Sequence, residues 1–418
     1  MLTVNDLKGL QGKKVYVRVD FNVPHKGEEI SDDNRIRAAI PTLAKLLEQG
    51  ARVLIMSHLG KVEWKKLKKG EKTQEEIDAQ MKKNNLGIVI EPLKKHLEAA
   101  LGHEVNVKFC PENRGEALKV AVDGLKDGEV LVAQNTRYQA GEEKNDEALS
   151  KEWASLVDAF VMDAFGSAHR AHASTVGVPA ILKEEGKQVA EGYLMIKEVE
   201  NLSRCVEVKD EDRPYVAVLG GLKVSDKIKV IDSLLKKCDY VIIGGAMAYT
   251  FKKAQGEKIG ASFCDEASLD YAKQCLEEAH GRIILPCDAV ITDSFEEKEG
   301  RIIKEVEGDI PEGFEGVDIG PKSREAFKAI IEKAKMVFWN GPMGVFEQKD
   351  FQAGTIAVCE AIKDLEGKAF SVIGGGDSAA AAKQLGYKQN FSHVSTGGGA
   401  SLEMIEKDGH LPGVDVLR

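Results

Sequence analysis

The sequence predicts an α/β protein made of two doubly wound, Rossmann-like domains with parallel sheets, joined by a hinge helix. Short apolar, β-rich runs recur along the chain, and each is followed by a turn and a helical stretch. These runs stay apolar on both faces, which is typical of parallel strands covered by helices on both sides. The length of 418 residues also exceeds what one hydrophobic core usually organises. We therefore expect two such domains.

The predicted strands fall into two groups. In the first half they are KKVYVRVD, ARVLIMSH, EVLVAQN and DAFVMDAFG. In the second half they are PYVAVLGG, DYVIIGG, GRIILPCDAV, KMVFWNG, AFSVIGGG and FSHVSTGGG. Between the groups, Val189, Tyr193, Ile196, Val199 and Leu202 recur at helical spacing. This pattern predicts a first domain over 1–188, an interdomain helix over 189–204 and a second domain from 205.

Residues 61–85 form a stretch rich in Lys and Glu, with little apolar periodicity. The pattern favours a solvated surface insertion, because charge runs usually face water. The alternative is a basic patch that docks a partner.

Composition excludes several classes of protein. Hydrophobic residues make up 43% of the chain and charged residues 30%, as in soluble globular proteins. The formal net charge of -10 opposes binding to nucleic acid or anionic membranes. The seven cysteines are scattered with no C-x-x-C pair, the N-terminus shows no targeting pattern, and no apolar run is long enough to span a membrane. We expect a cytoplasmic protein with reduced thiols.

Cations and polar groups follow the strands of the first half. Ligands of open parallel sheets bind beyond the carboxyl ends of the strands, so these side chains should share one rim. Convergent Arg and Lys side chains there would bind a small, highly anionic ligand. The residues concerned are Asp20, Asn22, Arg35, His58, Lys61, Arg137, His169, Arg170 and His172. His169 and His172 could hold a metal, but no Cys or carboxylate lies at ligand spacing, so anion binding or packing is favoured.

Glycines follow the strands of the second half, at 220–221, 244–245, 341, 374–376 and 397–399. Such clusters let backbone N–H groups approach phosphates, although glycine also serves tight turns. Lys223 and Lys227 lie four residues apart and would share one face of a helix. No P-loop, G-x-G-x-x-G, H-E-x-x-H or G-x-S-x-G motif is present, which argues against the common nucleotide, dehydrogenase, zinc-protease and serine-hydrolase sites.

Asp377 stands in the stretch SVIGGGDSAAAAKQLG, at the predicted start of a helix. It could cap the helix, since Asp is a favoured N-cap residue. It could also hold Mg²⁺ that arrives with a nucleotide, since Mg²⁺ takes one or two protein carboxylates and keeps phosphate oxygens and water as its other ligands. Both interpretations stay open at this point.

The motifs VRVDFNVP, SHLG, DAFGSAHRAH, VLGGLKVSDKI, FWNGPMGVFE, GGGDS and HVSTGGGASLE occur in this order along the chain. In this respect the sequence resembles the phosphoglycerate kinase family over nearly its whole length. The resemblance implies a monomeric, Mg²⁺-dependent glycolytic enzyme that transfers a phosphoryl group from 1,3-bisphosphoglycerate to ADP, giving ATP and 3-phosphoglycerate. It also implies that the nucleotide domain spans 205–405 and that the tail 406–418 returns to the first domain.

The resemblance also implies roles for individual residues. The acid-substrate positions fall on Asp20, Asn22, Arg35, His58, Lys61, Arg137 and Arg170. Arg35, Lys223 and Lys227 would be catalytic, and Lys227 would also contact the nucleotide. The other nucleotide positions fall on Gly316, Asn340, Glu347, Gly375, Gly376, Asp377 and Ser378, with Asp377 at the metal. Lys61 stands where many members have Arg, which replaces a planar fork by a point charge.

Phosphoryl transfer depends mainly on alignment and charge neutralisation, so no covalent enzyme intermediate is expected. We expect hinge closure to exclude water from the reaction. Two other functions share some of these features. A dinucleotide-dependent oxidoreductase would also use glycine-ended strands, and a non-catalytic binding protein for a phosphorylated metabolite would need no Mg²⁺.

Overall fold

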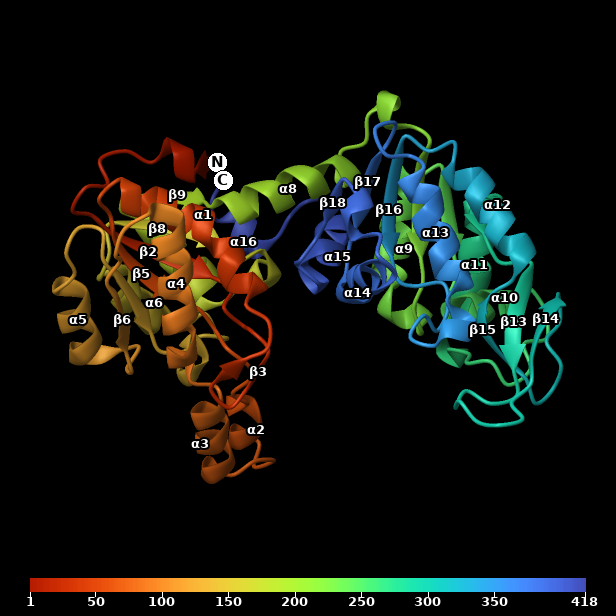
Figure 1. Ribbon diagram of the computed structural model, residues 1–418, viewed down its shortest axis with the longest axis horizontal. Coiled ribbons are helices and arrows are strands. Elements are labelled where there is room, and N and C mark those ends of the chain that lie inside the picture. The colour runs from red at the N-terminus through yellow and green to blue at the C-terminus, as the bar shows by residue number, and fades with distance from the viewer. The chain divides into compact units, whose positions relative to one another are not determined.

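The computed structural model describes residues 1–418 and divides the chain into two compact units. Unit 1 comprises Met1–Glu200 together with His410–Arg418, and unit 2 comprises Asn201–Gly409. The chain passes from one unit to the other within α8 (Tyr193–Val206) (Figure 1). None of the helices is both long enough and apolar enough to traverse a bilayer.

Unit 1 is built on a seven-stranded parallel sheet with the order β1-β9-β8-β2-β5-β7-β6. Its strands are β1 (Leu2–Thr3), β2 (Lys14–Val19), β5 (Arg52–Met56), β6 (Val107–Cys110), β7 (Val130–Ala133), β8 (Ala159–Asp163) and β9 (Gln188–Glu191). Its helices include α1 (Asn34–Glu48), α4 (Ile90–Leu101), α5 (Gly115–Asp123), α6 (Glu147–Ala154) and α7 (Val178–Glu184). The direction of the strand order changes at β2, so a ligand crevice is expected beside the end of this strand.

Strand β2 shows why this sheet is covered on both faces. Val15, Val17 and Val19 point to one face, where they join the core formed with α1 and α4. Tyr16 points to the other face and stacks on Phe160 of β8, with ring centroids 5.3 Å apart. The continuous apolar run in the sequence thus reports burial from both sides, as predicted.

The stretch 61–85 folds into two short helices, α2 (Trp64–Lys68) and α3 (Gln74–Lys83), which lie side by side below the sheet in Figure 1. Thr73 caps α3, because its hydroxyl accepts a hydrogen bond from Glu76 N at 3.2 Å while the Glu76 carboxylate accepts from Thr73 N. Most side chains here are exposed, as expected for a surface insertion. The small hairpin of β3 (His25–Lys26) and β4 (Glu29–Ile30) also belongs to unit 1.

The interdomain helix begins later than predicted. Residues Gln188–Glu191 form β9, which pairs in parallel with β8, so α8 begins at Tyr193 and not at 189. Val189 is buried within this strand and contributes to the sheet rather than to the helix. Val189 fitted the helical spacing only by coincidence, because a single apolar residue is compatible with both the period of about 3.6 residues of a helix and the two-residue period of a strand.

Unit 2 contains a six-stranded parallel sheet with the order β12-β11-β10-β16-β17-β18. Its strands are β10 (Tyr215–Leu219), β11 (Tyr240–Ile243), β12 (Ile283–Ile284), β16 (Met336–Asn340), β17 (Phe370–Ile373) and β18 (His393–Val394). Its helices are α9 (Ile228–Lys237), α10 (Met247–Ala254), α11 (Leu269–Ala279), α12 (Pro321–Ile331), α13 (Ala353–Lys363), α14 (Gly376–Leu385) and α15 (Gly399–Glu406). Both units are therefore parallel α/β folds, as the sequence predicts.

The prediction of one strand over GRIILPCDAV is wrong. This stretch divides into β12 and β13 (Asp288–Thr292), and β13 lies in a separate antiparallel sheet with β14 (Ile303–Glu307) and β15 (Glu315–Ile319). Pro286 stands between the two strands. A proline lacks the N–H that would continue the ladder, so the chain leaves the parallel sheet here.

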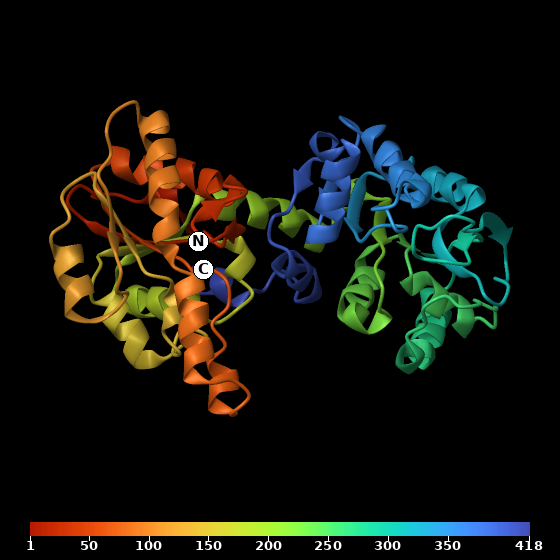
Figure 2. The same ribbon diagram turned by 60° about the horizontal axis from the view of Figure 1, so that its bottom comes forward.

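Both chain termini belong to unit 1, and their labels lie close together in both views (Figure 1 and Figure 2). The C-terminal segment contains α16 (Pro412–Asp415), and Gly413 N donates a hydrogen bond to Ala168 O at 2.8 Å. Residues 406–409 belong to unit 2, so the returning tail begins at His410 rather than at 406.

Candidate active site

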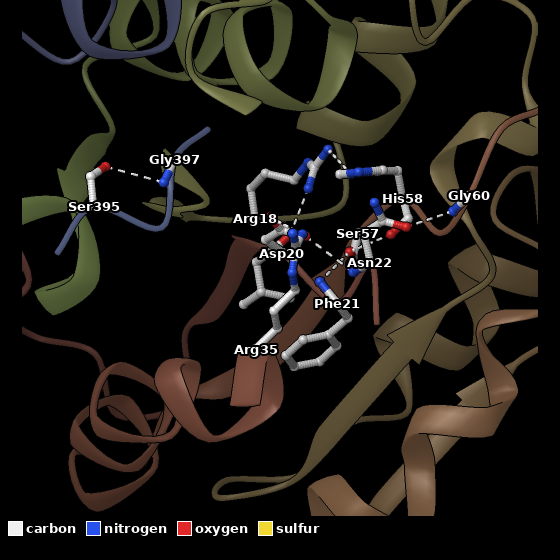
Figure 3. Close-up of polar contacts among 11 residues, drawn as sticks. Arg18, Asp20, Phe21, Asn22, Arg35, Ser57, His58, Gly60, Ser395 and Gly397 are labelled. Atoms are coloured by element: carbon white, nitrogen blue, oxygen red, sulfur yellow. Dashed lines mark hydrogen bonds and ion pairs between the residues drawn. The ribbon is translucent and has the colours of Figure 1, made fainter. Parts of the chain in front are cut away.

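The rim of unit 1 is organised around the end of β2. Arg35, in the first turn of α1, donates to both carboxylate oxygens of Asp20 at 2.8 Å (Figure 3). Asn22 N donates to the same carboxylate at 3.1 Å. The Arg35 side chain is 45% exposed, so this pair holds the guanidinium in place while leaving part of it open to solvent.

The loops that follow β5 and β7 are joined to this rim by hydrogen bonds. Gly60 N donates to Asn22 Oδ1 at 2.8 Å, and Gly60 O accepts from an Arg137 terminal nitrogen at 2.6 Å. Asn135 Oδ1 accepts from Arg137 N at 3.0 Å, which fixes the backbone of the short helix η3 (Thr136–Tyr138). Arg137 keeps its buried Nε–H without a partner in the chain. A buried donor of this kind is costly unless a ligand accepts from it.

A cavity of about 630 Å³ opens beside these groups and is lined by Lys61, Arg137, Arg170 and His172, among others. The structure therefore brings three of the predicted cations to one cavity. Asp20, Asn22 and Arg35 connect to it through the hydrogen bonds of the same rim, whereas the His58 side chain is hydrogen-bonded to Arg18; none of these four residues lines the cavity. His169 does not line this cavity.

His58 is buried and is held as a neutral ring. An Arg18 terminal nitrogen lies 3.0 Å from His58 Nδ1, and a guanidinium can only donate, so we assign Nδ1 as the acceptor and place the ring proton on Nε2. Burial lowers the pKa of His58 well below its usual value, and the positive charges of Arg18, Arg137 and Arg35 act in the same direction. His58 can therefore donate one neutral hydrogen bond to an anion.

Arg18 is a site residue that sequence reasoning missed. It is 1% exposed, and its Nε donates to Ser174 Oγ at 2.8 Å. Ser174 in turn donates from N and Oγ to the buried carboxylate of Glu142, at 2.8 and 2.7 Å. The signal was present in the sequence, because an arginine inside the buried run KKVYVRVD must find polar partners.

The rim of unit 2 is made of backbone. Gly220 N donates to Asn340 O at 2.8 Å, and the loops after β10 and β16 touch. A Cβ at Gly341 would lie 2.3 Å from Gly220 O, and Gly341 has a φ of 100°, so no other residue fits here without strain. Some of the glycines after these strands are therefore explained by the close packing of the loops, independently of any phosphate contact.

Asn340 and Ser378 hold these loops together. The Asn340 side-chain amide donates to Gly374 O at 2.5 Å, and its Oδ1 is buried with no partner in the chain. Ser378 is fully buried, and its hydroxyl accepts from Gly341 N at 2.5 Å. The Ser378 side chain thus points inward and supports the glycine loop.

The first turn of α14 presents Gly376 and Asp377, which are both exposed. The N-cap residue is Gly375, so Asp377 lies inside the helix and the capping interpretation is wrong. Lys227 donates from Nζ to Gly220 O and, at 3.4 Å, to Asn340 O. Burial lowers the pKa of Lys227 to about 8, and the negative charges of Asp377 and Asp226 partly oppose this shift. An ammonium has three N–H donors, so Lys227 keeps one donor and a positive charge for an anion beside these two carbonyls.

The prediction that Lys223 and Lys227 share a helical face is wrong. Val224–Asp226 forms a separate 3₁₀ turn, and α9 begins only at Ile228. Lys223 precedes this turn in extended conformation and is exposed, whereas Lys227 turns back onto the strand ends. The four-residue spacing applies only within a regular α-helix.

A second cavity, of about 240 Å³, lies in unit 2 and is lined by Gly316 and Glu347, two of the predicted nucleotide positions. Leu222, Tyr249 and Phe295 also line it and were missed, because they come from separate loops and from α10. The Tyr249 hydroxyl lies against Gly316, where an added Cβ would be 2.0 Å away. A mainly apolar cavity whose lining includes aromatic rings and carboxylates could accept a nucleoside.

Across residues 1–418, no three His, Cys, Asp or Glu side chains gather as a ready-made metal site. His169 and His172 therefore have no third ligand of these types. Asp377 remains a single exposed carboxylate beside backbone amides, which is the donor set expected where a nucleotide supplies the other ligands of Mg²⁺.

Comparison with known proteins decides the family. Residues 4–408 match the model of the family described as phosphoglycerate kinase. The chain belongs to the phosphoglycerate kinase family. It is 49% identical over 415 residues to the phosphoglycerate kinase of Staphylococcus saprophyticus, covering 98% of this chain and 97% of that one. It is 50% identical over 423 residues to that of Streptococcus thermophilus, covering 100% and 98% of the two chains.

Solved structures agree with this assignment. The phosphoglycerate kinase of Coxiella burnetii superposes with a TM-score of 0.83 at 37% identity, covering 100% of this chain and 98% of that chain. The enzyme of Pyrococcus horikoshii gives 0.76 at 31% identity, with the same coverage. Membership in the phosphoglycerate kinase family makes this chain a kinase of glycolysis, and it confirms the predicted fold class, enzyme class and reaction class.

Proposed function

We propose that the chain transfers a phosphoryl group reversibly from 1,3-bisphosphoglycerate to ADP, with unit 1 holding the acid and unit 2 holding the nucleotide. The observation that carries this division is the difference between the two rims. Unit 1 offers Arg35, Lys61, Arg137 and Arg170 around one rim, and unit 2 offers glycine amides, Lys227 and a slot for a nucleoside. These are the complements of a small phosphorylated acid and of a nucleotide.

On the acid side, Arg137 and Arg170 would bind the phosphate of the acid as planar forks, and Lys61 would add a point charge. His58 would donate its Nε2 proton to the same anion. Asp20 and Asn22 orient Arg35 and the Gly60 loop. We assign Arg35 to the phosphoryl group in flight, because its guanidinium is partly open and is held by Asp20 at the end of β2.

On the nucleotide side, the base would enter the cavity against Gly316 and the ribose would reach Glu347. The backbone amides at Gly375 and Gly376 would face the phosphates, since they stand at the first turn of α14. Lys227 would bind a phosphate oxygen and neutralise charge in the transition state, with Lys223 assisting from the neighbouring turn. Asn340 and Ser378 support this loop.

Asp377 would hold Mg²⁺, either directly or through water. Held there, the ion would supply positive charge that neutralises the phosphates of the nucleotide. The fit rests on the exposed carboxylate of Asp377, its place beside the amides of α14, and its charge interaction with Lys227.

The rims belong to different units, and phosphoryl transfer needs the attacking oxygen in line with the phosphorus. We therefore propose that the units close on one another about α8, which also excludes water. Small-angle scattering should show a smaller radius of gyration with both substrates present than with either alone. An unchanged radius would contradict closure. We place the enzyme in the cytoplasm as a monomer that binds neither nucleic acid nor membrane.

A coupled assay tests the proposed function directly. The purified chain is mixed with ADP, Mg²⁺ and 1,3-bisphosphoglycerate, and the ATP formed is followed. We expect turnover that requires all three components. Binding of the acid without ATP formation would favour a non-catalytic binding protein. In a separate mixture with a nicotinamide dinucleotide in place of ADP, an absorbance change would favour an oxidoreductase.

A further inference from the structure

The cavity beside Arg137 is lined by a cation, Lys65, that has no role in the proposed reaction. Besides Lys61, Arg137 and Arg170, its lining includes Lys65 and Lys66 from α2. Lys66 is paired with Glu63 at 2.5 Å, so its charge is already balanced. The side chains of Lys61, Lys65 and Arg170 make no hydrogen bond or ion pair within the chain. Lys65 is thus a third unbalanced cation at this cavity.

Helix α2 is anchored at this cavity and does not hang free in solvent. The indole Nε1 of Trp64 donates to Arg137 O at 2.8 Å. Glu63 is joined to Gln80 of α3 by two hydrogen bonds, from Glu63 N at 2.9 Å and from Gln80 Nε2 at 2.7 Å. The Asn84 side chain donates to Lys61 O at 3.1 Å. Lys65 directly follows Trp64, so the backbone that carries it is fixed relative to Arg137.

The charges around the cavity repel one another. Only Glu63 and Glu143 among its lining residues are acidic, and Glu63 already has Lys66 and, at 3.4 Å, Lys72 as partners. Burial lowers the pKa of His172 to about 4 against the opposing charge of Glu142, and Arg18, Arg137 and Arg170 lower it further. Glu143 alone is left to balance the remaining cations of the lining, and such an excess of like charge is unfavourable until an anion enters.

We propose that Lys65 is a further substrate-binding residue, whose ammonium contacts the phosphate of 3-phosphoglycerate together with Lys61, Arg137 and Arg170. The inference rests on the proposed function, since it places the phosphorylated acid in this cavity. A phosphate dianion carries two negative charges on three acceptor oxygens, and Lys61 brings one compact charge where a guanidinium would add a planar pair of donors beside Arg137 and Arg170. Lys65 supplies the additional charge from the inserted helix and favours the dianion over singly charged acids.

The test compares Lys65→Ala with Lys68→Ala, which removes an exposed lysine of the same helix that does not line the cavity. In steady-state kinetics toward ADP formation, we expect Lys65→Ala to raise the KM for 3-phosphoglycerate by about fivefold. Its kcat and its KM for ATP should be unchanged, and Lys68→Ala should match the unmodified chain. Lys65→Arg should restore most of the affinity.

Calorimetric titration of the full chain with 3-phosphoglycerate alone should show the same loss of affinity in Lys65→Ala. Trp64→Phe keeps a ring but removes the donor to Arg137 O, and we expect it to weaken 3-phosphoglycerate binding in the same direction. Equal affinity of Lys65→Ala and Lys68→Ala would overturn the proposal. Absence of turnover and of 3-phosphoglycerate binding in the unmodified chain would instead overturn the proposed function.

Discussion

The two units share a parallel α/β plan but build their rims by different means. Unit 1 uses side chains, and it supports them with buried charges such as Arg18 and Glu142. Unit 2 uses backbone, and it supports the glycine loops with small polar groups such as Ser378 and Asn340. A compact acid that carries both a carboxylate and a phosphate would be recognised best by cations, whereas a nucleotide offers a flat base and phosphates that backbone amides can reach. Under the proposed function, the same fold would serve two kinds of ligand through the residues at the ends of its strands.

This contrast has an energetic consequence. The rim of unit 1 is supported by buried polar groups, Arg18, Ser174 and Glu142, inside an apolar sheet. Loss of one of these partners leaves a buried charge without compensation, which is costly in a low-dielectric interior. The loops of unit 2 need close packing, and any side chain at Gly341 would clash with the backbone of Gly220. Four experiments separate these two designs.

The largest effect is expected for Arg35→Ala. We expect kcat to fall by about 10²- to 10³-fold, because the guanidinium acts on charge that develops in the transition state. The KM for nucleotide should change little, since Arg35 belongs to unit 1. Steady-state kinetics with each substrate varied in turn check this. A rise in KM with an unchanged kcat would contradict the catalytic role of Arg35.

Glu142→Gln tests the buried frame of unit 1. The substitution removes the negative charge that faces Ser174 and Arg18, and we expect it to destabilise unit 1 by about 3 kcal/mol. Urea unfolding can be followed by Trp153 in unit 1 and by Trp339 in unit 2, each after the other two of the three tryptophans are replaced by Phe. The control Glu152→Gln removes a partly exposed partner of Arg114 and should cost about 1 kcal/mol or less. Equal losses in the two variants would show that the frame is not critical.

Asp377→Ala tests the metal role in unit 2. We expect the Mg²⁺ concentration for half-maximal activity to rise about tenfold, which is the loss of one carboxylate ligand at about 1.4 kcal/mol. The helix should persist because Gly375 is its N-cap, and circular dichroism checks this. Asp226→Ala is the control, since Asp226 also lies near Lys227 but outside α14. Superimposable Mg²⁺ titrations would remove Asp377 from the metal site.

The smallest effect is a pH dependence. Burial lowers the pKa of Lys227 to about 8, and only the protonated ammonium can neutralise phosphate. The charged form is complete below this pKa and is lost as pH rises through it, so kcat/KM should fall by half near pH 8. Lys227→Arg should move this decline to higher pH, because a guanidinium keeps its proton. A profile that is flat to about pH 10, the ordinary range of a lysine, would contradict this assignment.

Much of the fold could be predicted because it depends on local patterns. Apolar runs such as PYVAVLGG and DYVIIGG mark buried strands. These two consecutive runs form β10 and β11, which pair in parallel. The errors occurred where one pattern fits two structures. Val189 fits a helix and a strand, and Pro286 divides a run that otherwise reads as continuous.

The site was predictable to a similar extent. The rule that ligands meet the carboxyl ends of parallel strands led to Lys61, Arg137 and Arg170, which line one cavity. It could not lead to Tyr249 or Phe295, which reach the second cavity from a helix and a distant loop. Nor could it assign a direction to Ser378, whose hydroxyl points inward to Gly341 N.

The sequence by itself determined that this protein has two parallel sheets, one ending in cations and the other in glycines, because strand periodicity and the residues after each strand are local properties. Only the tertiary structure decided which polar groups face one another: Arg18 with Glu142 through Ser174, Trp64 with Arg137 O, and Lys65 with the cavity of Lys61, Arg137 and Arg170. Such contacts join residues far apart in the chain, and their existence depends on how whole elements pack rather than on any pattern of neighbours.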